Sequence, residues 1–343
     1  MADGPVAVAG PHLVRTVEEA AIACASTIGR GDRHHSDQVA VSAMRRVLDT
    51  VPVRGQIVIG EGERDQAPML WSGERFGNSG DGAPELDIAV DPLEGTNLCA
   101  TGGPGAIAVL AGSERGGLLT APDVYMEKIM VGPASRDLLG DAIRLEHSPE
   151  RNVGAIAEAE GLPVSEITVV VLERQRHEEL VAGLRRAGAR VRLIGDGDLS
   201  AGILSAMPGS GVQAAMGSGG APEGVIAAAA LRCLGGGMLG QLLVRNEAEE
   251  RRLVETGGAD AGRVLTTKEL APGRNLIFCA TGVTDGALVS GVRFNRGTIE
   301  THTLQITNGP PELTRITRRR RHGRPAESDD SGGVGLARSG SVV

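Results

Sequence analysis

The stretch Glu85–Leu98 reads ELDIAVDPLEGTNL, and its two halves predict different things. The first half carries the apolar run of a buried strand, as far as Val90. The second half places two carboxylates, a proline, a glycine and a hydroxyl within the positions Asp91–Thr96. A buried carboxylate needs a partner, and divalent cations such as Mg²⁺ prefer carboxylate oxygens. We therefore predict a metal site at this strand end; the alternative is an acidic turn in which Thr96 caps a helix.

The same turn also suits a phosphate group. Pro92 stiffens the backbone, and Gly95 lets a ligand approach it closely. Gly95 and Thr96 then offer N–H groups and a hydroxyl for phosphate oxygens, especially where a helix begins. This turn is therefore predicted to bind both a metal ion and a phosphate group.

A second acidic cluster follows another predicted strand, Gln56–Gly60, within the run IVIGEGERDQAPML. Glu61, Glu63 and Asp65 come directly after that strand. Acidic ends of two strands in one sheet can converge on shared metal ions. The alternative is a solvated acidic loop.

Two further candidate ligands lie at predicted helix starts. Glu223 stands in GSGGAPEG, where Pro222 and Glu223 would suit the first turn of a helix without any function. The functional interpretation makes Glu223 a metal ligand and Gly219–Gly220 a loop that a substrate approaches closely. Asp37, in RHHSD, is a ligand or a helix cap, and its position alone favours the cap.

The composition describes a globular protein and excludes several classes. The 343 residues are 41% hydrophobic and 23% charged, with 1% aromatics, so the core must consist of Ala, Val, Leu and Ile. A net charge of -8 argues against a general nucleic-acid binder. Four cysteines without a CxxC pair indicate reduced thiols in a cytoplasmic protein. We expect neither a secretion signal nor a membrane span.

Strands alternate with helices along the chain, which predicts a layered α/β fold. Helices are expected at residues 13–28, 36–48, 178–186, 199–207 and 222–234, and strands at 56–60, 86–91, 106–111, 167–172, 190–195, 212–216 and 276–281.

The domain organisation is predicted from polar segments. The polar segment Ser148–Pro163, which contains Pro149, Gly161 and Pro163, predicts a boundary near residue 150. The charged segment Arg245–Leu270 is predicted to be a loop region at the surface. The expected units are a metal-binding domain at 1–150, a substrate-binding domain at 151–310, and a disordered tail at 311–343, which has almost no apolar residues.

Seven motifs together resemble the class II fructose-1,6-bisphosphatases, some of which also cleave sedoheptulose-1,7-bisphosphate. The motifs are GRGD (29–32), SDQVAVSAMR (36–45), IVIGEGERDQAPML (57–70), DIAVDPLEGTN (87–97), APDVYMEKIMVGP (121–133), DGD (196–198) and GGAPEG (219–224). DPLEGT is also similar to the wider lithium-sensitive superfamily that includes inositol monophosphatase. Glu94, where that superfamily usually has Asp, points to class II. The resemblance implies an α/β/α/β/α sandwich of the sugar-phosphatase type.

The resemblance also implies a role for each matching residue. The implied metal ligands, for two or more Mg²⁺ or Mn²⁺ ions, are Asp37, Glu61, Asp91, Glu94 and Glu223. The implied catalytic residues are Thr96, which helps to orient the attacking water, Asp65 and Glu61. The implied substrate-binding residues are Glu94, Gly95, Thr96, Tyr125, Arg174, Gln175, Arg176, Asp196, Gly197, Asp198 and Gly220.

The implied reaction is metal-dependent hydrolysis of the 1-phosphate of a sugar bisphosphate, with fructose-1,6-bisphosphate as the expected substrate in gluconeogenesis. Two departures from the family pattern bear on sugar specificity: Arg33 replaces the usual lysine of GRGDK, and RQR at 174–176 replaces KPR. The alternatives are a phosphatase with altered sugar specificity, broader activity on inositol or nucleotide phosphates, and a catalytically weak sugar-phosphate sensor. We expect a homodimer or homotetramer, without nucleic-acid or membrane partners.

Overall fold

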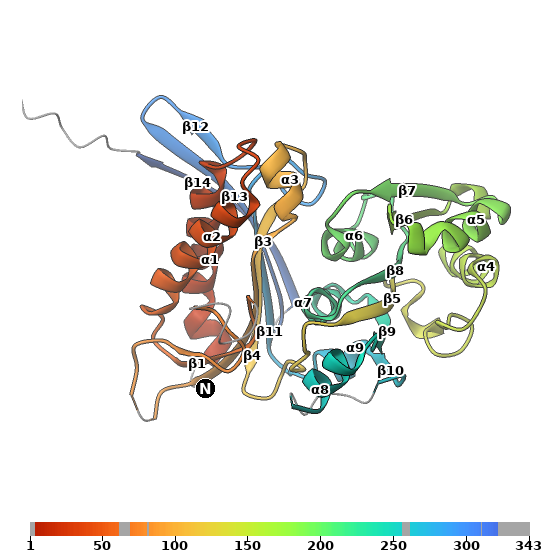
Figure 1. Ribbon diagram of the computed structural model, residues 1–343, viewed down its shortest axis with the longest axis horizontal. Helices are drawn as coiled ribbons and strands as arrows, with labels where there is room; N and C mark the ends of the chain where they lie inside the picture. The colour runs from red at the N-terminus through yellow and green to blue at the C-terminus, as the bar shows by residue number, and fades with distance from the viewer. Residues whose placement is uncertain (1–3, 62–68, 81, 256–260, 310, 322–343) are drawn as a thin grey trace, which may run out of the picture.

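The computed structural model has two mixed β-sheets and three groups of helices, stacked in five layers (Figure 1). It describes residues 4–61, 69–80, 82–255, 261–309 and 311–321. One pair of helices covers the outer face of the first sheet, a second pair lies between the sheets, and a third covers the second sheet. In that order the pairs are α1 (Pro5–Ala25) with α2 (Arg33–Leu48), α6 (Asp198–Ser205) with α7 (Ala221–Leu234), and α4 (Pro149–Glu160) with α5 (Glu178–Arg186). The predicted α/β/α/β/α sandwich is confirmed.

The first sheet combines strands from both ends of the chain. In the described residues it has the order β12-β13-β11-β4-β3-β1-β2, and β14 pairs with β13. Only the pair of β1 and β3 is parallel among these strands. The strands are β1 (Arg54–Ile59), β2 (Arg75–Phe76), β3 (Glu85–Glu94), β4 (Ile107–Glu114), β11 (Leu276–Gly282), β12 (Arg293–Asn295), β13 (Thr298–Asn308) and β14 (Pro311–Arg321).

The second sheet is formed by the middle of the chain, in the order β10-β9-β5-β8-β6-β7. Its strands are β5 (Tyr125–Val131), β6 (Thr168–Leu172), β7 (Arg190–Ile194), β8 (Ala214–Gly220), β9 (Gly237–Leu243) and β10 (Val264–Thr266). Shorter helices are α3 (Thr96–Thr101), α8 (Glu247–Glu255) and α9 (Thr267–Leu270).

The composition of α7 explains its place between the sheets. Its sequence APEGVIAAAALRCL is apolar on nearly every side, and the four alanines Ala227–Ala230 are each 0% exposed. A helix that is apolar all round is buried on all sides. Small side chains let both sheets approach it, which suits a chain with few aromatic residues.

The segment Ser148–Pro163 contains the helix α4, which the sequence analysis did not predict. Ser148 caps α4 by accepting a hydrogen bond from the backbone N–H of Arg151, and Pro149 occupies the first turn. Gly161, with φ 64°, ends the helix in the left-handed conformation. Pro149 and Gly161, which indicated a boundary, thus lie at the two ends of this helix. The two-domain division remains a prediction; the chain changes from the first sheet to the second between β4 and β5, and returns between β10 and β11.

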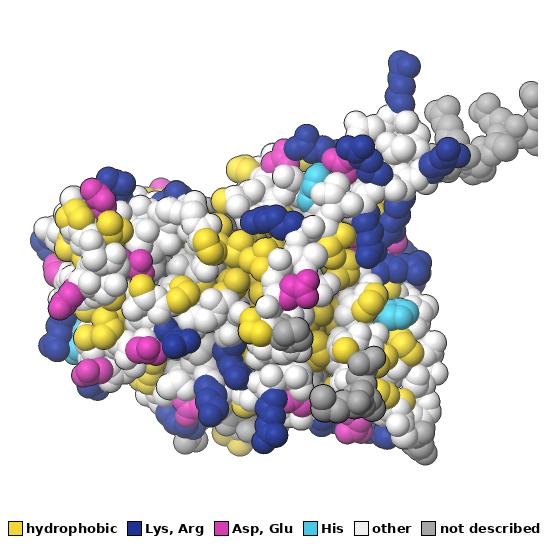
Figure 2. Space-filling model, turned by 180° about the vertical axis from the view of Figure 1, so that it is seen from behind, with side chains coloured by type: hydrophobic (Ala, Val, Ile, Leu, Met, Phe, Trp, Pro, Cys, Tyr) yellow, Lys and Arg dark blue, Asp and Glu magenta, His cyan; other side chains and the backbone are white. Residues whose placement is uncertain are grey.

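The predicted disordered tail is wrong for residues 311–321, which form β14. This strand has little apolar surface, but its arginines have partners. Arg318 Nη1 and Arg320 Nη2 lie 2.9 Å and 2.7 Å from Oε2 of Glu18, whose side chain is 0% exposed on α1. Figure 2 shows basic side chains gathered at the side of the molecule where β14 ends. The remainder of the tail, 322–343, lies outside the described residues.

Other differences concern elements that the sequence pattern did not predict. The strands β5, β9, β12 and β13 were missed, and the segment Arg245–Leu270 contains α8, β10 and α9. Among the described residues, no helix combines the length and the apolar character that a membrane crossing requires.

Candidate active site

A bulge near the end of β3 brings two of the predicted ligands to the same side of the sheet. Asp91 pairs with Val109 of β4, and Glu94 pairs with Ile107, so β3 has one extra residue between these pairs. In a regular strand, residues three apart point to opposite faces. The extra residue reverses the direction of Glu94, and Pro92 suits this place because it lacks an N–H to pair.

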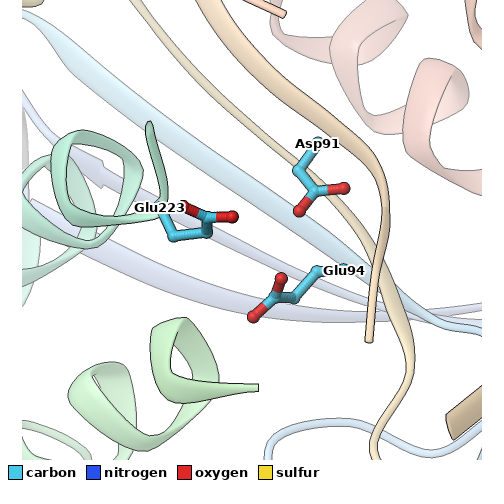
Figure 3. Close-up of side chains that lie close together, drawn as sticks. All are labelled: Asp91, Glu94 and Glu223. Atoms are coloured by element: carbon cyan, nitrogen blue, oxygen red, sulfur yellow. The ribbon is translucent and has the colours of Figure 1, made fainter. Parts of the chain in front are cut away.

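The carboxylates of Asp91, Glu94 and Glu223 converge (Figure 3). One oxygen from each lies within 4.8 Å of the others. Glu223 comes from the first turn of α7, which begins directly after β8. The sheet and the middle helix layer therefore meet at this cluster.

Two oxygens of the cluster lack the hydrogen bonds that buried carboxylates normally have, whereas Asp91 Oδ1 accepts from the N–H of Leu93 at 3.0 Å. Glu94 Oε1 and Glu223 Oε2 are buried and have no hydrogen-bond partner among the described residues. Burial, followed by the charges of neighbouring carboxylates, raises the pKa of Asp91 and Glu94 well above the usual range. Burial also raises the pKa of Glu223, although Lys128 opposes this shift. A hard divalent cation would relieve both the missing partners and the repulsion, so these residues fit such an ion.

Asp37 and Thr96 lie next to each other and next to this cluster. The Thr96 hydroxyl lies 3.0 Å from Asp37 Oδ1, to which it can donate, and 3.0 Å from the carbonyl oxygen of Leu93. Neither residue is a helix cap. Asp32 caps α2 by accepting from the N–H of His35, and Gly95, with φ 81°, precedes α3. The cap interpretation is therefore wrong for both residues.

Glu61 lies two residues beyond β1, with its N–H bonded to the carbonyl of Leu70 at 2.7 Å. Burial, followed by the charges of Asp37 and Glu223, raises the pKa of Glu61 to about 7. β1 and β3 are parallel neighbours, with Ile59 paired to Ala89, so the residues that follow them lie at the same edge of the sheet. Glu63 and Asp65 lie outside the described residues.

Lys128 was missed by the sequence analysis, although it stands in the quoted motif YMEK. Its side chain is 1% exposed, its Nζ lies 2.5 Å from Asp198 Oδ2, and it donates to the carbonyl oxygen of Gly220 at 3.0 Å. Lys128 thus links β5 to the starts of α6 and α7. The signal that could have identified it is the charged pair Glu127–Lys128 between apolar residues.

A basic and aromatic group lies beside the cluster, because Tyr125 pairs with Gly220 across β5 and β8. The guanidinium carbons of Arg176 and Arg245 lie 4.9 Å and 4.2 Å from the centre of the Tyr125 ring. Arg176 Nε and Nη2 donate to the hydroxyl and the carbonyl of Ser218, at 2.8 Å and 2.7 Å. Arg245 was missed, since its charged surroundings indicated a surface segment.

His177, also missed, holds Ser218 in place. The N–H of Ser218 donates to His177 Nε2 at 2.8 Å, so the other ring nitrogen carries the proton that bonds the Leu172 carbonyl at 2.8 Å. Burial lowers the pKa of His177, which favours this neutral form.

The two aspartates of the DGD motif have different partners. Asp198 bonds Lys128, whereas Asp196 Oδ2 accepts from Asn97 Nδ2 at 3.2 Å. Asn97 Oδ1 in turn accepts from Arg33 Nη1 at 2.7 Å, so Arg33 is connected to the second sheet. Gly197, with φ 90°, lies between them at the start of α6.

Arg174 and Gln175 are not brought to the same group as Arg176. They line a separate pocket together with Glu178 and Arg185 of α5. The Arg174 guanidinium donates to the neighbouring carbonyl of Glu173 at 2.9 Å. The sequence motif RQR therefore places its two arginines in different surroundings.

The comparison with known families agrees with this arrangement. The model of the family described as "Bacterial fructose-1,6-bisphosphatase, glpX-encoded" matches residues 8–320. The chain belongs to this family. Family membership confirms the resemblance that the seven sequence motifs indicated.

Proteins with similar sequences are found in Synechococcus and Crocosphaera. A protein of Synechococcus sp. (strain JA-3-3Ab) is 47% identical over 321 residues, which cover 87% of this chain and 91% of the relative. Proteins of Synechococcus elongatus and Crocosphaera subtropica are each 46% identical over 321 residues, covering 87% of this chain and 92% of the relative. All three are named D-fructose 1,6-bisphosphatase class 2/sedoheptulose 1,7-bisphosphatase.

Proposed function

We propose that the protein hydrolyses the 1-phosphate of fructose-1,6-bisphosphate to give fructose-6-phosphate and inorganic phosphate. The observation that carries this proposal is the convergence of Asp91, Glu94 and Glu223, with two buried unpartnered oxygens, beside the hydroxyl of Thr96. Family membership supports the choice of substrate. The reaction belongs to carbohydrate metabolism, where it would serve gluconeogenesis.

The proposed ligands for Mg²⁺ or Mn²⁺ are Asp37, Glu61, Asp91, Glu94 and Glu223. When bound, such ions supply positive charge to the phosphoryl group and acidify water at the site. The carboxylates come from α2, β3 and α7 and from the residues after β1, so the site requires both the sheet and the middle helix layer.

Thr96 positions the attacking water. Its hydroxyl can donate to Asp37 Oδ1 or to the Leu93 carbonyl, which leaves its oxygen free to accept a hydrogen bond from water. The water oxygen forms the new bond to phosphorus as the bond to the C1 oxygen breaks. The water proton passes to a neighbouring carboxylate, for which Glu61 is the candidate, and the C1 oxygen takes up a proton.

The sugar and its second phosphate are held by the group around Tyr125. Arg176 is fixed by Ser218 and faces the Tyr125 ring, and Arg245 lies over the same ring. Guanidinium groups bind phosphate oxygens in pairs, which suits a phosphate that does not react. Asp198, held by Lys128, is placed to accept a hydrogen bond from a sugar hydroxyl.

Sedoheptulose-1,7-bisphosphate is a second candidate substrate. The relatives carry both activities in their names. The loop at 174–176 has glutamine where the family usually has proline, and Arg174 points to a different pocket from Arg176. A sugar with one more carbon would use this part of the site.

The test is phosphate release from a panel of sugar monophosphates and bisphosphates, with Mn²⁺ or Mg²⁺. We expect kcat/KM to be highest for a ketose bisphosphate and at least tenfold lower for monophosphates. Equal rates on inositol or nucleotide monophosphates would contradict the proposed specificity. An absence of turnover on every substrate would favour the sensor alternative.

We also propose that the protein is a cytoplasmic homodimer or homotetramer. The four cysteines are free and buried, as expected for a reducing compartment. Symmetric assemblies are common among soluble enzymes, and sedimentation velocity of the full chain would measure the oligomeric state.

A further inference from the structure

A polar pocket of about 310 Å³ lies at the end of the first sheet opposite to the carboxylate cluster. β1 and β3 begin near this pocket and end at the cluster, and Arg115 follows the end of β4 that is remote from Glu94. In Figure 1 the cluster end of β3 leads into α3 at the top, whereas the β1 label marks the pocket end near the bottom. An occupant of this pocket would not touch the candidate active site.

Among the described residues, the pocket is lined by four arginines, Arg45, Arg54, Arg75 and Arg115, and by one acidic residue, Asp49. The other lining residues are small or neutral: Gly55, Phe76, Gly77 and Ser79. A wall with four cations and one anion, and with one large apolar side chain, suits a compact anion better than an apolar molecule.

The arginines are held in place by acids inside and outside the lining. Arg45 donates to Asp49 in the lining, and its Nε donates to Glu74 Oε1 at 2.7 Å. Arg115 Nη1 lies 3.4 Å from Asp87 Oδ1, and Glu85 lies 3.6 Å from both Arg54 and Arg115, which is longer than a hydrogen bond. These acids reduce the repulsion among the arginines. Because a guanidinium has five N–H donors, one or two contacts to carboxylates do not use all of them.

We propose that this arginine pocket is a second anion-binding site, for a small molecule that carries a phosphate or a similar dianion. Its forked donors can bind oxyanion oxygens in pairs, and its volume admits a small metabolite. Because it lies away from the carboxylate cluster, binding there leaves the substrate path open. The proposal is independent of the reaction at the cluster.

Inorganic phosphate is the probe for the test, by isothermal titration calorimetry of the full chain in EDTA. Phosphate can also bind the candidate active site, so every titration is repeated in the Arg176→Ala background. We expect one phosphate site that Arg176→Ala does not affect. The double variant Arg75→Gln/Arg115→Gln should weaken this site at least tenfold.

Two controls keep the result interpretable. Arg136→Gln/Arg144→Gln removes two exposed arginines outside the pocket and should leave phosphate binding unchanged. Arg75→Gln alone alters an exposed side chain and serves if the double variant fails to fold. Wild-type phosphate affinity in both pocket variants would overturn the proposal. It would also be overturned if no phosphate site survived in the Arg176→Ala protein, or if the pocket variants changed the oligomeric state instead of phosphate binding.

Discussion

Lys128 Nζ lies 2.5 Å from Asp198 Oδ2, deep enough that the lysine side chain is 1% exposed. The same lysine opposes the rise in the pKa of Glu223. One buried cation therefore stabilises a residue at the sugar side of the site and a residue at the metal side.

We expect Lys128→Met to affect both residues. Leaving the partly exposed Asp198 without its partner should cost roughly 1–3 kcal/mol of unfolding free energy. KM should rise because Asp198 is no longer fixed, and Mn²⁺ should bind more tightly because a cation that repels it has been removed. Thermal denaturation, steady-state kinetics and Mn²⁺ titration measure the three effects.

The double variant Lys128→Met/Asp198→Asn separates positioning from stability. It removes the unpaired charge and should recover part of the melting temperature, while KM stays high. Recovery of a normal KM together with stability would show that Lys128 has a structural role alone. Arg45→Met, which breaks the ion pair with Glu74 far from the site, is the matched control and should leave KM unchanged.

Thr96→Ala should lower kcat by ~10²–10⁴-fold, the usual contribution of a group that positions a proton-transfer partner. Metal binding and KM should change little, because the proposed role is confined to the transition state. Thr96→Ser keeps the hydroxyl that lies 3.0 Å from Asp37 and should retain part of the activity. Near-normal kcat in the alanine variant would remove Thr96 from the catalytic residues.

The stability of the metal-free protein should fall as pH rises. Burial raises the pKa of Glu61 from 4.5 to about 7, and the pKa values of Asp91 and Glu94 also rise. A raised folded-state pKa stabilises the fold below the unfolded-state pKa, and this contribution is lost as pH rises through the folded-state value. We therefore expect the melting temperature in EDTA to decrease between about pH 5 and pH 8.

Mn²⁺ should reverse this trend, because ionised carboxylates bind it best. Glu223→Gln should show a weaker pH dependence in EDTA and a smaller stabilisation by Mn²⁺. A pH-independent melting temperature in EDTA would mean that the carboxylates do not interact.

Phosphate release after chelation, without added metal, would contradict the proposed metal dependence.

The two arginines of the RQR motif should have unequal effects. Arg176→Ala removes a side chain that contacts Ser218 and the Tyr125 ring, and it should raise KM for the bisphosphate at least tenfold. Arg174→Ala alters a different pocket and is the matched control, with a smaller change in KM. Equal effects of both variants would show that the bound substrate reaches both pockets.

Truncation after Thr317 should destabilise the protein, contrary to what the composition of the tail suggests. It removes Arg318 and Arg320 and leaves the carboxylate of Glu18 buried without its two cations. Breaking a buried pair in this way costs roughly 3–5 kcal/mol. Truncation after Arg321 keeps both arginines and is the control; an equal melting temperature for the two proteins would contradict this account.

The sequence predicted the layered fold and the acidic residues that come together at strand ends, because those features depend on local patterns. The alternation of apolar strands and helices is readable from neighbouring residues, and Asp91, Glu94 and Glu223 stand in recognisable motifs. The same reasoning failed for α4, since Ser148 and Gly161 serve equally well in a cap or a loop. It failed for β14 because that strand is stabilised by ion pairs to Glu18, more than 290 positions earlier.

Within the site, too, the residues that the sequence did not predict depend on contacts between distant segments. Lys128, Arg245 and His177 become important only through Asp198, Tyr125 and Ser218, each on another element. The convergence of Asp91 and Glu94 depends on a bulge that strand periodicity does not predict. Sequence motifs identified the chemistry, while the charge compensation around it required the fold.

The insertion of β11 between β4 and β13 has a consequence for how the chain is made. Ala111 pairs with Phe278, so the ribosome synthesises the entire second sheet before β4 receives its second neighbour. Pairings between such distant segments slow folding, and an unpaired strand edge invites aggregation meanwhile. The nascent chain therefore carries an open sheet edge while residues 115–275 are made, and the sheet that carries Asp91 and Glu94 gains its remaining strands only afterwards.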